Sequence, residues 1–145
     1  MVDDDENDVF FMLEAFKKAG VEIPVQIAKD GKEATDYLRG LGNFCDRARY
    51  QLPSIVLLDL KLPFVMGLDV LRAIREELKL PIIVIILSAS REDADISAAY
   101  RLGANAYVVK PSDLSKLTET VYALHLFWLK TNMPPRVSIK AEPGE

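Results

Sequence analysis

Hydrophobic and polar positions follow two different periods along this chain, one typical of helices and one typical of buried strands. Four short runs of apolar and β-branched residues are predicted as strands, at 25–28, 55–58, 82–87 and 106–109. Apolar residues at helical spacing predict helices at 7–19, 32–39, 67–77, 93–102 and 113–131. Unbroken apolar strands that alternate with helices are typical of a parallel sheet covered on both faces. The pattern therefore predicts an α/β fold with a doubly wound parallel sheet.

The composition is that of one ordinary soluble domain. The chain has 145 residues, 50% of them hydrophobic, and a net charge of −4. This balance argues against disorder and gives no support for nucleic-acid binding through bulk charge. We assign residues 1–131 to the domain and expect the proline-containing segment 132–145 to be a flexible tail.

Single residues and short segments narrow the chemistry and the location. The chain has one cysteine, Cys45, and one histidine, His125, which excludes an internal disulfide and a two-histidine metal site. The longest apolar run, 80–87, is far shorter than a membrane span, and the amino terminus is acidic where a signal peptide is basic. We therefore expect a cytoplasmic protein.

Polar residues directly follow the predicted strands, at the edge where doubly wound sheets bind ligands. Asp59 follows 55–58, Ser88 follows 82–87, Lys110 follows 106–109, and three aspartates at 3–5 follow an apolar stub. Carboxylates that converge at one sheet edge repel each other, which favours a hard cation such as Mg²⁺. A cation, an ammonium group and a hydroxyl group around one carboxylate can stabilise a transferring phosphoryl group. This arrangement predicts that Asp59 is a nucleophile that forms an aspartyl phosphate.

Each of these residues taken alone also fits a structural role. Asp59 can cap a helix or lie in a loop, and Asp3 and Asp4 can form a solvated acidic end. Tyr107 lies in a predicted strand, where an aromatic side chain is typical of the core. Only the combination points to phosphoryl chemistry.

Six motifs taken together resemble the response-regulator receiver domain of two-component signalling. They are VDDD at 2–5, LLDLKLP at 57–63, Gly67, LSAS at 87–90, GANAY at 103–107 and VKP at 109–111. The resemblance implies a flavodoxin-like receiver fold with a five-stranded parallel sheet. The loop 40–53 and the segment 127–131 further resemble the single-domain response regulators associated with phytochrome-type sensor kinases.

The resemblance implies a phosphoryl-acceptor site with a bound metal. Asp59 is expected to accept a phosphoryl group from a phospho-histidine of a sensor histidine kinase. Mg²⁺ is expected to be held by Asp4, by Asp59 and by the backbone carbonyl of Lys61, with Asp3 acting partly through water. Lys110 is expected to pair with the phosphoryl group, and the Lys110–Pro111 peptide bond is expected to be cis.

The resemblance also implies a switch next to this site. Ser88 is expected to move toward a phosphoryl oxygen while Tyr107 rotates inward, and Lys61 and Ser90 occupy positions that tune hydrolysis. Such a protein is not a classical enzyme, because it catalyses only its own phosphorylation and dephosphorylation. It signals through phosphorylation-dependent contacts with other proteins.

Two departures from the family pattern concern the first strand and the loop after Asp59. Only Met1 and Val2 precede the acidic cluster, where the family has a full central strand. We therefore expect a missing upstream segment or a misassigned start, a gap in the sheet, and weak anchoring of the acidic residues after the stub. In addition, residues 64–66 replace the usual acidic residue before Gly67.

The last predicted helix carries more apolar residues than one core-facing side needs. We expect Tyr122, Leu126 and Trp128 to contribute to a homodimer contact, although scattered surface apolar residues are the ordinary alternative. No nucleic-acid or membrane partner is expected.

Other function classes share part of this pattern. A phosphatase or phosphotransferase of the haloacid dehalogenase type also uses an aspartate at a strand end, but it needs a second aspartate at the position of Lys61. Nucleotide or flavin binding has less support, because no glycine-rich loop follows a predicted strand in this sequence. A degenerate receiver that acts as a constitutive scaffold is disfavoured by Asp59 and Lys110 but left open by the short start.

Overall fold

The structure, a computed structural model, describes residues 1–137. At its centre lies a parallel sheet of β1 (Ile55–Leu58), β2 (Ile83–Ser88) and β3 (Ala106–Val109), in the order β1-β2-β3. The predicted strands 55–58 and 106–109 are confirmed at both ends, and 82–87 is displaced by one residue. Residues 138–145, which belong to the predicted tail, lie outside the described residues.

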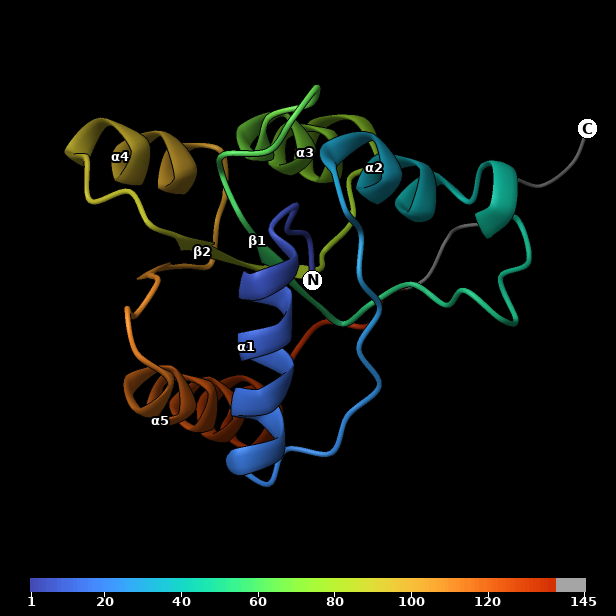
Figure 1. The fold of residues 1–145 in the computed structure, drawn as a ribbon. Coiled ribbons are helices and arrows are strands. Elements are labelled where there is room, and N and C mark those ends of the chain that lie inside the picture. The colour runs from blue at the N-terminus through green and yellow to red at the C-terminus, as the bar shows by residue number, and fades with distance from the viewer. Residues whose placement is uncertain (138–145) are drawn as a thin grey trace, which may run out of the picture.

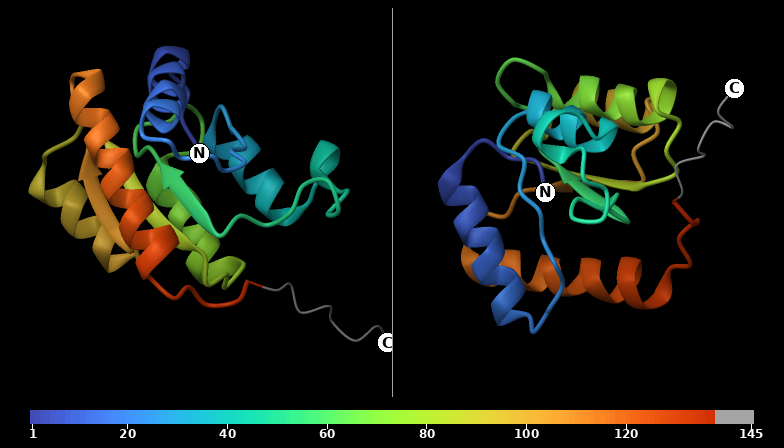
Figure 2. Two further views of the ribbon diagram at one scale, coloured as in Figure 1. Left: turned by 90° about the horizontal axis from the view of Figure 1, so that it is seen from below. Right: turned by 90° about the vertical axis from the view of Figure 1, so that its right-hand side faces the viewer.

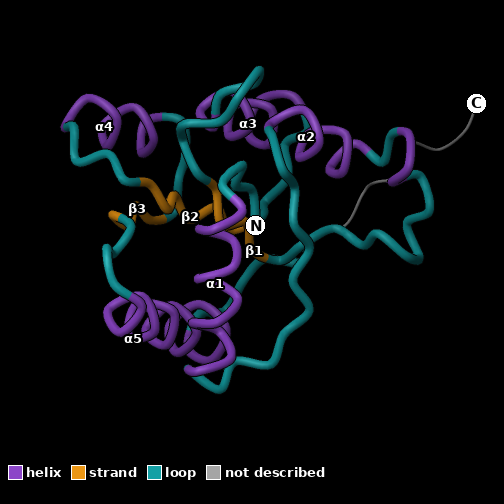
Figure 3. Tube along the Cα trace, viewed as in Figure 1, coloured by secondary structure: helices purple, strands orange, loops and turns teal. Residues whose placement is uncertain are grey.

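Helices cover both faces of the sheet (Figures 1 and 3). α2 (Gly31–Arg39), α3 (Gly67–Arg72) and α4 (Asp93–Arg101) lie on one face, while α1 (Glu6–Lys18) and α5 (Leu114–Leu124) lie on the other. The right-hand view of Figure 2 shows the sheet between α3 and α5. α3 and α5 continue as π-helical segments, Ala73–Glu77 and His125–Thr131, so the predicted helices are confirmed to within one residue at each end. No helix among the described residues is long and apolar enough to cross a membrane.

The core has one apolar layer on each face of the sheet. Under α2, α3 and α4 it contains the fully buried Leu58, Leu71 and Ile74. On the other face, Met12 of α1 packs in one cluster with Val121 of α5. All six residues of β2 are buried, since this strand has a neighbour on each side and helices on both faces. The layers hold the carboxyl ends of the strands at one edge of the sheet.

The amino-terminal strand is a stub, and this changes the sheet on its side of β1. Val2 forms isolated parallel bridges to Ala28 on one side and Leu58 on the other. Val2 is the one residue of the stub that pairs with both neighbours. The segment 25–28 therefore has a pairing partner only near Ala28, and it does not form a strand along its length. The predicted strand 25–28 is therefore wrong, and the described residues form three strands rather than five. The truncation of the first strand is confirmed.

The amino group of Met1 lies beside this stub and gives a prediction for pH. It donates a hydrogen bond to the Gln26 carbonyl at 2.8 Å, and desolvation lowers the pKa of this amine to about 6. The amine of an unfolded chain has a pKa of about 8, so the unfolded state binds more protons between these values. The free energy of unfolding is therefore expected to rise from pH 6 to pH 8, by about 1 kcal/mol after allowance for solvent screening. Urea titrations at both pH values measure this rise.

Acetylation of the amino terminus provides the control, because it removes the titrating group and should abolish the rise. His125→Gln should leave the rise in place. A rise that survives acetylation would assign it to another group.

Candidate functional site

Three aspartates meet at the carboxyl edge of the sheet. Asp3 and Asp4 follow the stub and Asp59 follows β1, and one carboxylate oxygen from each lies within 4.8 Å of the other two. The bridge from Val2 to Leu58 brings the two chain segments together. Asp3 and Asp59 are buried, with 2% and 9% of their surfaces exposed, whereas Asp4 is exposed. The structure therefore brings together the three predicted carboxylate ligands.

The ammonium group of Lys110 lies within this cluster. It donates hydrogen bonds to Asp3 at 2.8 Å, to Asp59 at 2.9 Å and to Asp8 at 2.7 Å. Lys110 follows β3, so its long side chain reaches across the end of β2 to the acidic residues. Burial alone would lower the pKa of Lys110, but its three carboxylate partners outweigh burial and raise the pKa above its usual value. The ammonium group is therefore a permanent positive charge in the site.

Burial dominates at Asp3. Desolvation raises the pKa of this carboxyl group, although hydrogen bonds from Lys110 and from the N–H of Asp5 act in the opposite direction. The chain thus holds a poorly solvated carboxylate next to a second one, at Asp59. Positive charge nearby strongly stabilises such a pair of carboxylates.

Asp8 is a member of the site that sequence reasoning missed. Its side chain is 44% exposed and lies on the first turn of α1. Asp5 caps this helix by accepting hydrogen bonds from the N–H groups of Asn7 and Asp8, which places the first turn over the sheet edge. A signal was present, since an acidic residue on the first turn of a helix that starts beside an acidic cluster lies near that cluster.

Ser88 ends β2 and Tyr107 lies in β3, and both contact the loop after β2. Ser88 is fully buried, and its hydroxyl accepts a hydrogen bond from the N–H of Ser90 at 3.3 Å. The Tyr107 hydroxyl donates to the Ser90 carbonyl at 3.0 Å, while the Ser90 hydroxyl donates to Asp95 at 2.5 Å. Both predicted switch residues are therefore connected to Ser90.

The loop after β1 passes close behind Asp59. The N–H of Lys61 donates to the Asp59 carboxylate at 3.3 Å. A Cβ atom at Gly67 would lie 2.1 Å from the Asp59 carbonyl oxygen, so a residue without a side chain is required there. Phe64, in the segment that lacks the usual acidic residue, has a φ of 64° and is 92% exposed.

The Lys110–Pro111 peptide bond is trans, because the residues that the structure describes contain no cis peptide bond. The predicted cis bond is therefore wrong for this structure. The trans form is the intrinsically favoured one even before proline. Lys110 continues the pairing of β3 with its N–H donating to the Ser88 carbonyl at 2.8 Å.

The site is rich in oxygen ligands and negative charge. The carboxylates of Asp3, Asp8 and Asp59 bond to one ammonium group, and the carboxylate of Asp4 lies with those of Asp3 and Asp59. Carboxylate oxygens are the ligands that Mg²⁺ prefers, and one or two of them with several waters form its usual site. The donor set therefore fits a hard divalent cation.

Comparison with known protein families agrees with this geometry. Residues 1–122 match the family described as the response regulator receiver domain. The chain belongs to this family. The resemblance found in the sequence is thereby confirmed, together with the flavodoxin-like receiver fold. As a receiver, the chain is a two-component signalling protein rather than a classical enzyme.

Three solved response regulators are similar to this receiver over most of its length. RPA3017, described in red light signaling of R. palustris, is 35% identical with a TM-score of 0.86, over 93% of this chain and 96% of that chain. The phosphorylated cyanobacterial phytochrome response regulator RcpA is 36% identical with a TM-score of 0.84, over 93% and 95%. The Mn(2+)-bound form of Rcp1, a response regulator of Synechocystis, is 31% identical with a TM-score of 0.81, over 93% and 96%. The narrower resemblance to phytochrome-associated regulators is also confirmed.

Proposed function

We propose that this receiver accepts a phosphoryl group on Asp59 from a phospho-histidine of a sensor histidine kinase. The observation that carries the proposal is the surroundings of the Asp59 carboxylate, which accepts a hydrogen bond from the Lys110 ammonium group at 2.9 Å and lies within 4.8 Å of carboxylate oxygens of Asp3 and Asp4. In the transfer, an Asp59 oxygen attacks phosphorus and the phosphorus–nitrogen bond of the donor breaks. The histidine nitrogen leaves with the electron pair, and an acyl phosphate forms.

Asp3, Asp4, Asp59 and the backbone carbonyl of Lys61 are the groups that would hold Mg²⁺. The metal-bound relative Rcp1 and the acidic cluster of this chain support this assignment. A bound divalent cation neutralises the charge that develops on the phosphoryl oxygens. The Asp3 carboxylate orients this side of the site, since it accepts from both Lys110 and the N–H of Asp5.

Lys110 and the loop after β2 convert phosphorylation into a signal. A phosphoryl group adds strong acceptors and about −1.5 to −2 of charge at Asp59. Its oxygens would draw the ammonium group of Lys110 away from Asp8 and would compete for the Ser88 hydroxyl. Ser88 contacts Ser90, and Ser90 holds the Tyr107 hydroxyl, so this movement would release Tyr107. The protein would also catalyse hydrolysis of its own acyl phosphate, and Lys61 and Ser90, two residues after Asp59 and Ser88, would tune the rate of this step.

The kinase partner is proposed to be of the phytochrome type. The similarity to RcpA, described as a phytochrome response regulator, and to RPA3017, described in red light signaling, supports this choice. Histidine kinases use ATP to form the phospho-histidine, so we place the reaction in the cytoplasm. Phosphorylation-dependent contacts with other proteins would carry the output.

Removal of divalent metal tests the function directly. With acetyl phosphate and millimolar Mg²⁺, intact-mass spectrometry should show one added phosphoryl group per chain. An excess of EDTA should reduce the labelled fraction at least about 100-fold, because the acceptor then has only Lys110 to offset the charge of the donor.

Restoring Mg²⁺ in excess over EDTA is the control and should restore labelling. Equal labelling with and without the chelator would contradict a metal-assisted transfer. If the chain is labelled under none of these conditions, the proposal that Asp59 accepts a phosphoryl group would be contradicted.

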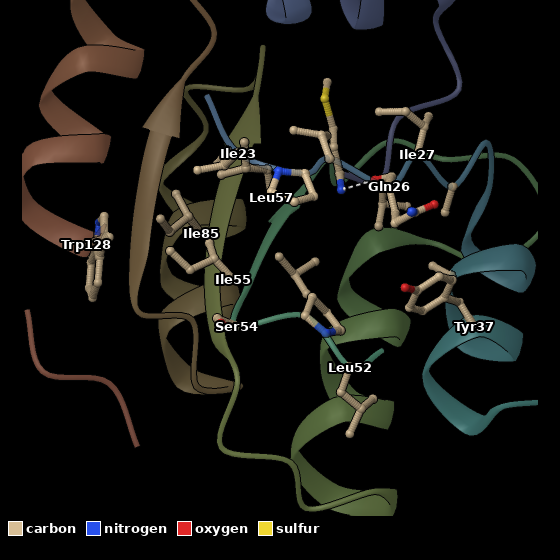
Figure 4. Close-up of a pocket in the computed structure, with 18 of the residues that line it drawn as sticks. Ile23, Gln26, Ile27, Tyr37, Leu52, Ser54, Ile55, Leu57, Ile85 and Trp128 are labelled. Atoms are coloured by element: carbon tan, nitrogen blue, oxygen red, sulfur yellow. Dashed lines mark hydrogen bonds between the residues drawn. The ribbon is translucent and has the colours of Figure 1, made fainter. Parts of the chain in front are cut away.

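We also propose a homodimer through the outer side of α5 and its π-helical extension. Tyr122 and Leu126 are exposed, at 50% and 43% of their surfaces, and Phe127 adds a third apolar side chain. Trp128 is half-buried and lines a pocket (Figure 4), which makes Leu126 the better position for a test. Leu126→Lys should raise the dissociation constant of the dimer at least about tenfold, because burying a charge at an apolar contact is unfavourable.

Sedimentation equilibrium of Leu126→Lys against the unchanged chain measures this shift. Ser115→Lys, at an exposed position near the start of the same helix, is the matched control and should leave the dimer intact. Unchanged self-association of Leu126→Lys would place the contact elsewhere.

A further inference from the structure

The ammonium group of Lys110 already has a partner for each of its N–H groups. It donates to Asp3 at 2.8 Å, to Asp8 at 2.7 Å and to Asp59 at 2.9 Å. A lysine ammonium group has three donors and no acceptor. A phosphoryl oxygen that binds Lys110 therefore has to replace a carboxylate that holds one of these donors.

The three carboxylates differ in how readily Lys110 can release them. The side chains of Asp3 and Asp59 are only 2% and 11% exposed, whereas the side chain of Asp8 is 44% exposed. A buried carboxylate that loses its partner stays poorly solvated, which is strongly unfavourable, while an exposed one is hydrated instead. Asp8 is therefore the partner whose release is least unfavourable.

Asp8 also stands apart from the carboxylates that gather for a metal ion. That group consists of Asp3, Asp4 and Asp59. Asp8 comes from the first turn of α1 rather than from the end of the stub or of a strand. A cation held by the other carboxylates would leave Asp8 as the carboxylate available to Lys110.

We propose that Asp8 is a positioning residue that holds Lys110 in the resting receiver and is exchanged for a phosphoryl oxygen when Asp59 is modified. This inference rests on the proposed function, because Asp59 has to carry the phosphoryl group. No covalent bond changes in the exchange. One hydrogen bond of Lys110 passes from the Asp8 carboxylate to the phosphoryl oxygen, and water hydrates Asp8.

The exchange makes Asp8 a competitor of the phosphoryl group. Asp8→Asn replaces a charged acceptor with a neutral one, which holds an ammonium group less strongly. One donor of Lys110 is then more readily available to an incoming phosphoryl group. The variant should therefore bind a phosphoryl group more tightly than the unchanged chain, whereas loss of a purely structural contact would weaken binding.

Beryllium fluoride with Mg²⁺ is the probe, because it mimics a phosphoryl group on a carboxylate. Asp8→Asn should lower its dissociation constant at least about fivefold. Labelling by acetyl phosphate should show the same decrease in apparent KM with little change in the maximal rate, because Asp8 is not a member of the metal-binding group. Asp8→Glu keeps the carboxylate and should bring both constants back toward those of the unchanged chain.

Glu6→Gln is the matched control for the loss of charge. Glu6 is an exposed acidic residue on the same turn of α1, and none of the three bonds of Lys110 goes to it. Its neutralisation therefore reports the general effect of charge at this helix terminus. The dissociation constant of beryllium fluoride should stay within about twofold of that of the unchanged chain.

The side-chain nitrogen resonance of Lys110 reports the exchange directly. NMR of the full chain, with the resonance assigned by its absence from Lys110→Met, measures it. In EDTA and without beryllium fluoride, Asp8→Asn should shift this resonance and Glu6→Gln should not. With beryllium fluoride and Mg²⁺ bound, the unchanged chain and Asp8→Asn should give the same resonance, because Lys110 has left position 8 in both.

The outcomes distinguish this inference from the proposed function. If the unchanged chain is labelled but binds beryllium fluoride as tightly as Asp8→Asn or more tightly, the role of Asp8 is refuted and the acceptor stands. A resonance that still differs between the two in the bound form would show that Asp8 keeps Lys110, which also refutes the exchange. If the unchanged chain is neither labelled nor able to bind beryllium fluoride, the proposed function fails and the exchange fails with it.

Discussion

The substitution Asp59→Asn is expected to abolish phosphorylation by acetyl phosphate in the presence of Mg²⁺. An amide is a far weaker nucleophile than a carboxylate, and the change also removes one of the oxygens of the Asp3, Asp4 and Asp59 cluster. The labelled fraction, measured by intact-mass spectrometry, should fall to below about 1% of that of the unchanged chain.

Asp93→Asn is the matched control for this experiment. Asp93 is exposed on the first turn of α4 and is not a member of the acidic cluster, so its substitution should leave labelling unchanged. Asp8→Asn provides a second comparison, because it keeps the acceptor and removes one partner of Lys110. Equal labelling of Asp59→Asn and the unchanged chain would refute the assignment of the acceptor.

Strands could be predicted where their ends are marked by a change in hydrophobicity within the segment itself. The runs at 55–58 and 106–109 are bounded by polar residues and pack between helical layers, so their ends coincide with the change in hydrophobicity. The run at 25–28 is also mainly apolar, but its pairing depends on a neighbour that the stub supplies only near Ala28. Pairing is a property of two segments, and hydrophobicity along one segment does not report it.

The candidate site was predictable to the extent that it follows from strand ends. Asp59 and Lys110 come directly after their strands, so a parallel sheet brings them to one edge. Asp8 was missed because its approach depends on how α1 leaves the sheet, which is set by the cap at Asp5. The isomer of the Lys110–Pro111 bond was expected from family resemblance rather than from local chemistry, and the structure has the other form.

Replacement of Lys110 should destabilise the metal-free protein and make it more responsive to Mg²⁺. Lys110→Met removes the ammonium group from three carboxylates, and the side chains of Asp3 and Asp59 are only 2% and 11% exposed. Loss of one partner of a buried ion pair costs about 3–5 kcal/mol, and the solvent access of Asp8 reduces the expected loss to about 2–3 kcal/mol. Urea unfolding in EDTA measures this loss.

Magnesium should reverse much of this loss, because a divalent cation can neutralise the same oxygens that Lys110 contacts. A ligand at ten times its dissociation constant stabilises the folded state by about 1.4 kcal/mol. The unchanged chain should gain less, since its ammonium group competes with the cation for Asp3 and Asp59. Lys116→Met, at a side chain that is 72% exposed, is the control and should change neither quantity by more than about 0.5 kcal/mol. An equal gain from Mg²⁺ in Lys110→Met and in the unchanged chain would mean that the cation and the ammonium group do not share these carboxylates.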